Sequence, residues 1–178
     1  GLEKSRNLVS VRLLRDITVP YAISYMKRFG FGDVDLPPSL SLALGSVSLS
    51  PLKLASGYAV IANGGYSTNT HLIKSIENEQ GKVVDDDHTF PVACDATCQQ
   101  HESLGEHKNA PRFLAKSVIP EDNMYIMTQA LRGVIQHGTG RAAMVLKRSD
   151  LAGKTGTTND RRDAWFAGFS SKVVCVTW

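Results

Sequence analysis

Apolar residues recur at helical spacing near the start of the chain. Leu8, Val11 and Leu14 lie three residues apart, and the Asn7 side chain stands where it can cap the helix that they begin. The helical pattern resumes over residues 21–29 and breaks at the glycines that follow. This part of the sequence therefore predicts two consecutive helices.

Two further helices carry their own start signals. Ser50 followed by Pro51 is a strong start, because serine caps a helix and proline fits its first position, and residues 63–65 supply the matching stop. The last helix begins at Pro120. We expect one of its faces to be apolar: Met124, Met127, Leu131 and Val134.

Strand-like runs dominate the last part of the chain. Runs around Lys154, Trp165 and Val173 predict three strands of an antiparallel meander, and residues 71–77 and 83–84 predict a separate hairpin. Because helices come first and most strands come last, the sequence indicates an α+β fold rather than alternating βαβ units.

The character of the sequence changes between residues 85 and 112. An acidic run opens this segment, and helical or strand periodicity is absent from it. We expect an insertion or flexible loop over residues 85–112 that interrupts one domain. The helical part of that domain would cover residues 1–84, and its last helix and sheet would cover residues 113–178.

Composition bounds the fold and argues against a nucleic-acid partner. The 178 residues are 42% apolar, which is enough to bury one sizeable core. A net charge of +3, with dispersed basic residues, argues against a nucleic-acid surface. No apolar run approaches the length of a membrane span.

The run Lys154-Thr155-Gly156-Thr157 places a cation, a glycine and two hydroxyls on one predicted strand. Side chains alternate along a strand, so Lys154 and Gly156 face one way and the two threonines the other. Gly156 leaves room for a ligand backbone to lie against the strand. This pattern suits a peptide-like substrate that bears a carboxylate, although an ordinary edge hairpin with a solvated lysine explains the run alone equally well.

Ser5-Arg6-Asn7 is an S-x-N triplet just before the first helix. Alone it is explained by a capping asparagine and a solvated serine. With K-T-G downstream it gives, in the right order, the second and third of three signatures shared by penicillin-binding proteins and serine β-lactamases; the first is S-x-x-K. Flanking stretches extend the match over most of the chain outside 85–112: residues 8–12, 41–45, 50–52, 58–65, 138–143, 153–159 and 163–168.

On these residues the chain resembles the transpeptidase domain of class A, bifunctional penicillin-binding proteins of the 1A type from Gram-negative bacteria. The resemblance implies helices packed on an antiparallel sheet, as in β-lactamases. It also implies a D,D-transpeptidase on the periplasmic face of the inner membrane, with no cofactor. Peptidoglycan stem peptides would be its substrates, and β-lactam antibiotics would acylate the same serine. A membrane anchor and a glycosyltransferase domain would lie outside these residues.

The resemblance also implies roles for individual residues. Ser5 would pass a proton to the leaving D-alanine, Asn7 would bind the substrate peptide and help to hold the base lysine, and Lys154 would supply positive potential. The hydroxyls of Thr155 and Thr157 would bind the terminal carboxylate of the substrate. The backbone N–H of Thr157 would be one oxyanion donor.

The nucleophile of the S-x-x-K signature is expected upstream of residue 1. Two such tetrapeptides do occur within the chain, at residues 24–27 and 50–53. Both follow the S-x-N triplet, which is the wrong order, so a helix cap or a surface pair is the better interpretation of each. We therefore expect these 178 residues alone to be inactive.

Cysteines and histidines gather in the expected insertion. Cys94 and Cys98 could form a disulfide, remain free thiols, or bind a metal with nearby histidines, and their spacing matches no common zinc pattern. A periplasmic location favours the disulfide. Cys175 lies in a strand that alternates apolar residues, which predicts a buried, inert thiol.

Two other functions remain open. A non-catalytic recognition or partner-binding module would lack the upstream S-x-x-K, but the intact S-x-N and K-T-G argue against decay of the site. A serine β-lactamase would be more compact than a chain with so long an insertion. Both ends of the chain look cut, and an uncovered sheet edge predicts either strands from another chain, as in a homo-oligomer, or instability in isolation.

Overall fold

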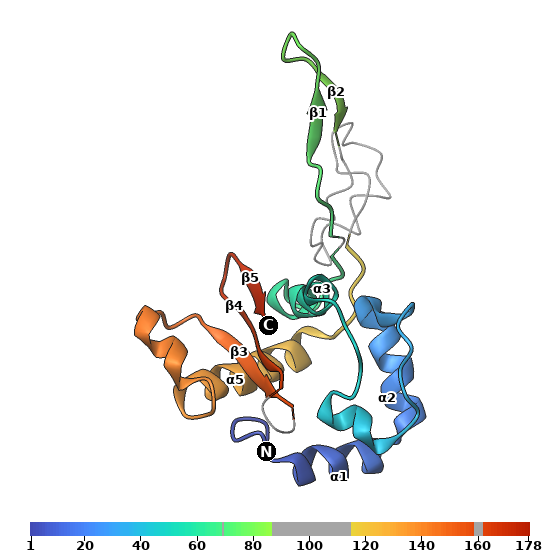
Figure 1. The fold of residues 1–178 in the computed structure, drawn as a ribbon, viewed down its shortest axis with the longest axis vertical. Helices are drawn as coiled ribbons and strands as arrows, with labels where there is room; N and C mark the ends of the chain where they lie inside the picture. The colour runs from blue at the N-terminus through green and yellow to red at the C-terminus, as the bar shows by residue number, and fades with distance from the viewer. Residues whose placement is uncertain (69, 87–114, 159–161) are drawn as a thin grey trace.

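The computed structural model describes residues 1–68, 70–86, 115–158 and 162–178 (Figure 1). Seven helical segments and five strands lie in this part of the chain. The sheet strands β3–β5 close the chain and most helices precede them, so the predicted α+β class is confirmed. The helical segments are α1 (Asn7–Ile17), α2 (Val19–Met26), η1 (Lys27–Phe31), η2 (Leu40–Leu44), α3 (Pro51–Ala62), α5 (Glu121–Gln136) and η3 (Arg141–Leu146).

A three-stranded antiparallel sheet forms the platform of the fold. Its order is β3-β4-β5, as the predicted meander requires, with β3 at Ala152–Thr157, β4 at Ala164–Phe169 and β5 at Val174–Thr177. Each strand pairs with the one that follows it in sequence. Consequently β3 is an edge strand: no described residue pairs with its other side.

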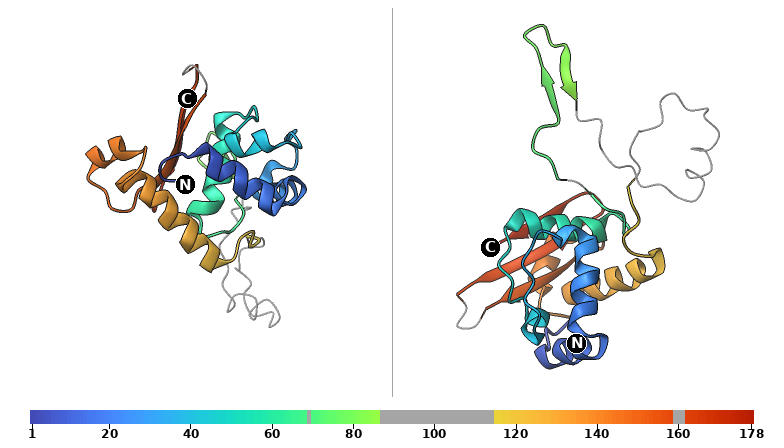
Figure 2. Two further views of the ribbon diagram at one scale, coloured as in Figure 1. Left: turned by 90° about the horizontal axis from the view of Figure 1, so that it is seen from below. Right: turned by 90° about the vertical axis from the view of Figure 1, so that its right-hand side faces the viewer.

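The core lies between this sheet and two helices. Leu131 of α5 packs with Ala152 and Phe169, and Tyr58 and Ile61 of α3 pack against the same cluster. Both helices therefore cover one face of the sheet, and Figure 2 shows them beside it from two further directions. A second cluster joins α3 to the start of α5: Val60, Val118, Ile119 and Met124.

The expected start signal of α3 is confirmed. The Ser50 side chain accepts a hydrogen bond from the backbone N–H of Lys53 at 3.1 Å, and Pro51 occupies the first helical position. The predicted cap of α1 is wrong, because Arg6 is the capping residue and Asn7 already lies inside the helix. The cause is a tight turn before it, in which Ser5 N–H bonds Leu2 O at 3.1 Å.

Two other expectations need correction. Cys175 is exposed, because the inward positions of β5 are occupied by Val174 and Val176, one residue out of phase with the prediction. Met127 shares the apolar face of α5 but remains 43% exposed, since neither core cluster includes it. The other three residues predicted for that face, among them Val134 with 0% exposure, are buried.

The predicted hairpin is present as β1 (Ser75–Glu77) and β2 (Val83–Asp86), which pair antiparallel. It projects away from the sheet and helices in Figures 1 and 2. The Asn78 side chain closes its turn by accepting hydrogen bonds from the N–H groups of Gln80 and Lys82. Residues 87–114 lie outside the described part, so the insertion expected over 85–112 and its division of the domain remain a prediction.

Candidate active site

The β3 strand carries Lys154, Thr155, Gly156 and Thr157 along its open edge. Its pairing places Lys154 opposite Ala167, and Thr155 opposite Phe166 on the other face of the sheet. The alternation expected from the sequence therefore holds in the structure. Among the described residues, a methyl group added at Gly156 would meet only the Trp165 side chain, at 3.3 Å, so none of the others covers the Gly156 face of the strand.

Lys154 and Ser5 meet beside this strand. The Lys154 ammonium donates a hydrogen bond to the Ser5 hydroxyl and a second one, 2.8 Å long, to the backbone O of Thr155. The lysine side chain is half-buried, and this burial lowers its pKa from the ordinary lysine value. The structure thus brings the S-x-N triplet against the K-T-G strand through a cation and a hydroxyl.

The segment before α1 is fixed on the C-terminal end of α5. The Lys4 ammonium donates to the backbone O of His137, and the Thr139 N–H donates to Glu3 O at 3.1 Å. Ser5 itself has a φ of 48°, a left-handed conformation that non-glycine residues seldom adopt. The end of α5 therefore sets the position from which the Ser5 hydroxyl reaches Lys154.

Gly138 makes this docking possible. A Cβ atom at this position would collide with the backbone O of Glu3 and lie 2.7 Å from the backbone O of Val134. Both obstacles are backbone atoms, which cannot turn away as a flexible side chain can. A glycine is consequently required where the first segment crosses the helix end.

Thr139 is a site residue that the motifs did not reveal. Its hydroxyl lies 2.6 Å from the Thr155 hydroxyl, while its backbone contacts Glu3 as described above. The residue therefore touches both the S-x-N segment and the K-T-G strand. In the sequence, Thr139 stands out only as part of the Gly138-Thr139-Gly140 run, which resembles the family. That resemblance assigned no role to Thr139.

Asn7 does not join the Lys154–Ser5 contact. It is the first residue of α1, its side chain is exposed, and no described residue hydrogen-bonds that side chain. Thr157, at the end of β3, is also exposed. The structure thus brings Ser5, Lys154 and Thr155 into one connected group and leaves Asn7 and Thr157 open at its margin.

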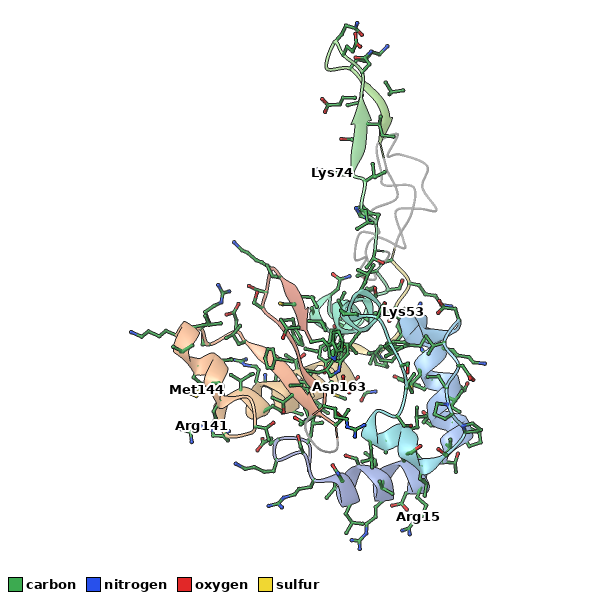
Figure 3. The ribbon with its side chains drawn as sticks, viewed as in Figure 1. Arg15, Lys53, Lys74, Arg141, Met144 and Asp163 are labelled. Carbon is green, nitrogen blue, oxygen red and sulfur yellow. The ribbon has the colours of Figure 1, made fainter. Side chains whose placement is uncertain are left out.

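The far end of the site is held by Asp163, which Figure 3 labels. Thr158 and Asp163 exchange hydrogen bonds, with the Asp163 N–H donating to the Thr158 hydroxyl at 2.8 Å. One carboxylate oxygen of Asp163 accepts a hydrogen bond from the Thr158 hydroxyl, and the other accepts one from the indole N–H of Trp178 at 2.8 Å. The ring of Trp178 packs on Trp165. These contacts tie the end of β3 to β4 and β5.

The two S-x-x-K tetrapeptides within the chain serve other purposes. Ser50 caps α3, and the Lys53 ammonium forms an ion pair with Asp33 at 2.6 Å. The hydrogen bond from Lys53 lowers the pKa of the Asp33 carboxyl. Ser24 and Lys27 are exposed, and in the described chain neither tetrapeptide shares a hydrogen bond with Ser5 or Lys154.

Neither a metal site nor a membrane-spanning helix lies in the part of the chain that the structure describes. The described residues contain no group of histidine, cysteine, aspartate or glutamate side chains that could hold a metal ion. Cys94 and Cys98, together with the histidines near them, lie outside the described residues. Of the helices that the structure describes, none combines the length and the apolar character needed to cross a membrane.

Comparison with known sequences gives a consistent result. Residues 1–174 match the family model of the penicillin binding protein transpeptidase domain. Penicillin-binding protein 1A of Neisseria flavescens is 42% identical over 178 residues, and that of Pseudomonas aeruginosa is 39% identical over 204 residues. Each comparison covers all of this chain, which spans only 20% and 25% of the two relatives.

Solved structures agree with the sequence comparison. Penicillin-Binding Protein 1A from Haemophilus influenzae superposes with a TM-score of 0.81 and 30% identity, over 99% of this chain and 28% of that one. The D,D-transpeptidase domain of an Eggerthella lenta peptidoglycan glycosyltransferase superposes with a TM-score of 0.68 at 21% identity, over 96% of this chain and 44% of that one, which supports the fold. The resemblance drawn from the motifs is confirmed, and the chain belongs to the family of penicillin-binding protein transpeptidase domains.

Proposed function

We propose that this chain forms one wall of the active site of a serine D,D-transpeptidase that cross-links peptidoglycan stem peptides. The observation that carries the proposal is the contact between Lys154 and Ser5 beside the open edge of β3. Acyl transfer from a peptide uses a cation, a proton-bearing hydroxyl and an unpaired strand edge that holds the peptide, in addition to a nucleophile with its base.

The open edge of β3 is suited to a peptide that ends in a carboxylate. A stem peptide ending in D-alanyl-D-alanine would lie along the strand and pair with its free backbone groups. Its carboxylate would accept hydrogen bonds from the hydroxyls of Thr155 and Thr157, in the positive potential of Lys154. The Thr157 N–H would stabilise the oxyanion that forms as the peptide carbonyl is attacked.

The direction of the Lys154–Ser5 hydrogen bond favours a role in proton transfer. An ammonium has only donors, so the Ser5 oxygen must accept from Lys154, and the serine proton remains free to point elsewhere. In the proposed reaction Ser5 gives that proton to the nitrogen of the leaving D-alanine as the peptide bond breaks. Ser5 then recovers a proton from the hydroxyl of the attacking serine, passed on by the base lysine of the S-x-x-K signature, and Lys154 stabilises the negative charge on Ser5 in between. Asn7 binds the peptide at the margin of the site.

The nucleophilic serine of the S-x-x-K signature is proposed to lie in sequence outside these 178 residues. Its hydroxyl would attack the carbonyl of the penultimate D-alanine, release the last D-alanine and form an acyl-enzyme, which an amine of a second stem then consumes. β-Lactams would acylate the same serine. The compared relatives are several times longer than this chain. The whole protein would act on the periplasmic face of the inner membrane and would also have glycosyltransferase activity.

Covalent labelling of the full-length protein with a fluorescent penicillin tests this proposal. We expect the wild type to be labelled and Lys154→Met to lose labelling. Lys53→Met, which removes an ammonium from an internal S-x-x-K tetrapeptide, is the matched control and should keep the labelling. An unlabelled wild type would contradict the proposal. Loss of labelling in Ser50→Ala would place the nucleophile inside the chain, and rapid turnover of nitrocefin would instead favour a β-lactamase.

A further inference from the structure

Thr139 joins the K-T-G strand to the segment that carries Ser5 without belonging to either motif. Its hydroxyl lies 2.6 Å from that of Thr155 on β3, and its N–H donates to Glu3 O, two residues before Ser5. A contact of 2.6 Å between two hydroxyl oxygens is a hydrogen bond of ordinary length, in which one of the two must donate. The direction of this bond therefore decides where the proton of Thr155 can point.

A threonine hydroxyl has one proton to donate and two lone pairs to accept with. If Thr155 donated to Thr139, its proton would be occupied and its oxygen would repel a carboxylate. If Thr139 donates instead, the Thr155 proton is free to bond an anionic ligand. A bound carboxylate can only accept, so it selects the second arrangement and strengthens it through the chain of two hydroxyls.

The backbone around Thr139 is well fixed. The N–H groups of Gly138 and Gly140 both donate to the backbone O of Val134, at 3.1 and 3.0 Å, and the Val134 side chain is completely buried. One turn earlier, Leu131 packs on Ala152 at the start of β3. The Thr139 hydroxyl is thus held at a defined place relative to the strand that carries Thr155.

We propose that Thr139 is a positioning residue that donates to the Thr155 hydroxyl and thereby aims the Thr155 proton at the carboxylate of the substrate or β-lactam. This inference rests on the proposed function, because it supplies a partner for the carboxylate-binding hydroxyl. It adds a specific consequence: the contribution of Thr139 depends on whether the ligand carries a carboxylate.

The experiment compares acylation of the full-length protein by benzylpenicillin and by its methyl ester, in which the carboxylate is masked. Thr139→Val keeps the side-chain shape and removes the donor. We expect it to slow acylation by benzylpenicillin roughly tenfold and acylation by the ester less than about twofold. Thr139→Ser should restore the rate with benzylpenicillin, and Thr128→Val, the same change at a position within α5, should alter neither rate.

A double mutant separates the proposed hydrogen bond from general damage. In a Thr155→Val background, adding Thr139→Val should have no further effect on acylation by benzylpenicillin, because its acceptor is gone. Equal losses with both ligands, no loss with either, or an undiminished effect in the double mutant would overturn the inference. A wild type that benzylpenicillin does not acylate would show that the proposed function itself fails.

Discussion

The Lys154 ammonium donates a hydrogen bond to the Ser5 hydroxyl, although 149 positions separate the two residues in the sequence. Lys154 comes from the edge strand of the sheet, and Ser5 from a turn that is docked on the end of α5. Their meeting depends on contacts outside both motifs, above all those of Glu3 and Lys4 with the helix end. Substitutions at these supports and at the pair itself should consequently have different effects on activity and on stability.

Lys154→Met should abolish acylation and still raise stability near neutral pH. Burial depresses the pKa of Lys154 below the unfolded value of about 10.4, so charging the ammonium in the folded state opposes folding. The unfolded chain binds more protons between the two pKa values, and the wild type should gain stability as the pH rises through them. Urea unfolding at about pH 7 and about pH 10 checks this. A mutant less stable than the wild type at the lower pH would give Lys154 a structural role.

Replacing Ser5 separates the demands of its backbone from those of its hydroxyl. Ser5→Gly and Ser5→Ala both remove the group that contacts Lys154, so both should lose acylation by penicillin. Because Ser5 has a φ of 48°, glycine should be more stable there than alanine by about 1 kcal/mol. Denaturant midpoints measure that difference, and equal midpoints would mean that the turn carries no strain.

Gly138→Ala should weaken both folding and activity. The added methyl group would collide with backbone atoms of Glu3 and Val134, and relief requires the segment before α1 to shift away from α5. We expect a loss of about 1–3 kcal/mol in unfolding free energy and slower acylation. Gly32→Ala is the matched control, since a Cβ there meets nothing within 4 Å. Should the two variants melt alike, the proposed docking of this segment would be wrong.

Asp150 links the approach to β3 with the β4–β5 turn. Its carboxylate pairs with Arg148 at 2.7 Å and accepts from the N–H and hydroxyl of Ser171, and these bonds, that from Arg148 foremost, hold its pKa well below the ordinary range. A depressed carboxyl pKa stabilises the fold above the unfolded pKa of about 3.9, and this contribution is lost as the pH falls through the folded value.

Asp150→Asn should therefore lower the melting temperature at about pH 7, and the difference from the wild type should shrink on acidification below about pH 3. Asp16→Asn, at an exposed carboxylate on α1, is the comparison for a simple loss of charge. A difference between wild type and Asp150→Asn that stays constant with pH would refute the assigned pKa shift.

The parts of the fold that follow from local pattern could be predicted. Ser50 and Pro51 specify the start of α3 by their own chemistry, and alternation along the run from Lys154 to Thr157 predicted its two faces. The predictions were wrong where contacts with other segments determine the local structure. Cys175 belongs to a strand whose phase is set by pairing with β4, and Asn7 lost its capping place to the turn at Ser5.

The supports of the site lay beyond sequence reasoning for a related reason. Gly138 and Thr139 both contact Glu3, which lies more than a hundred positions away in the sequence. No local sequence pattern reveals such a contact. Motifs identified Ser5, Lys154 and Thr155 because their chemistry recurs in a family. The residues that hold them in place, Gly138 and Thr139, can be identified only from the three-dimensional structure.

A crystal structure of the full-length protein acylated by benzylpenicillin would test these assignments most directly. We predict that the carboxylate of the bound drug accepts hydrogen bonds from the hydroxyls of Thr155 and Thr157, with Ser5 and Lys154 still in contact beside it. A carboxylate bound elsewhere, with the edge of β3 unoccupied, would contradict the claim that these residues form a wall of the active site.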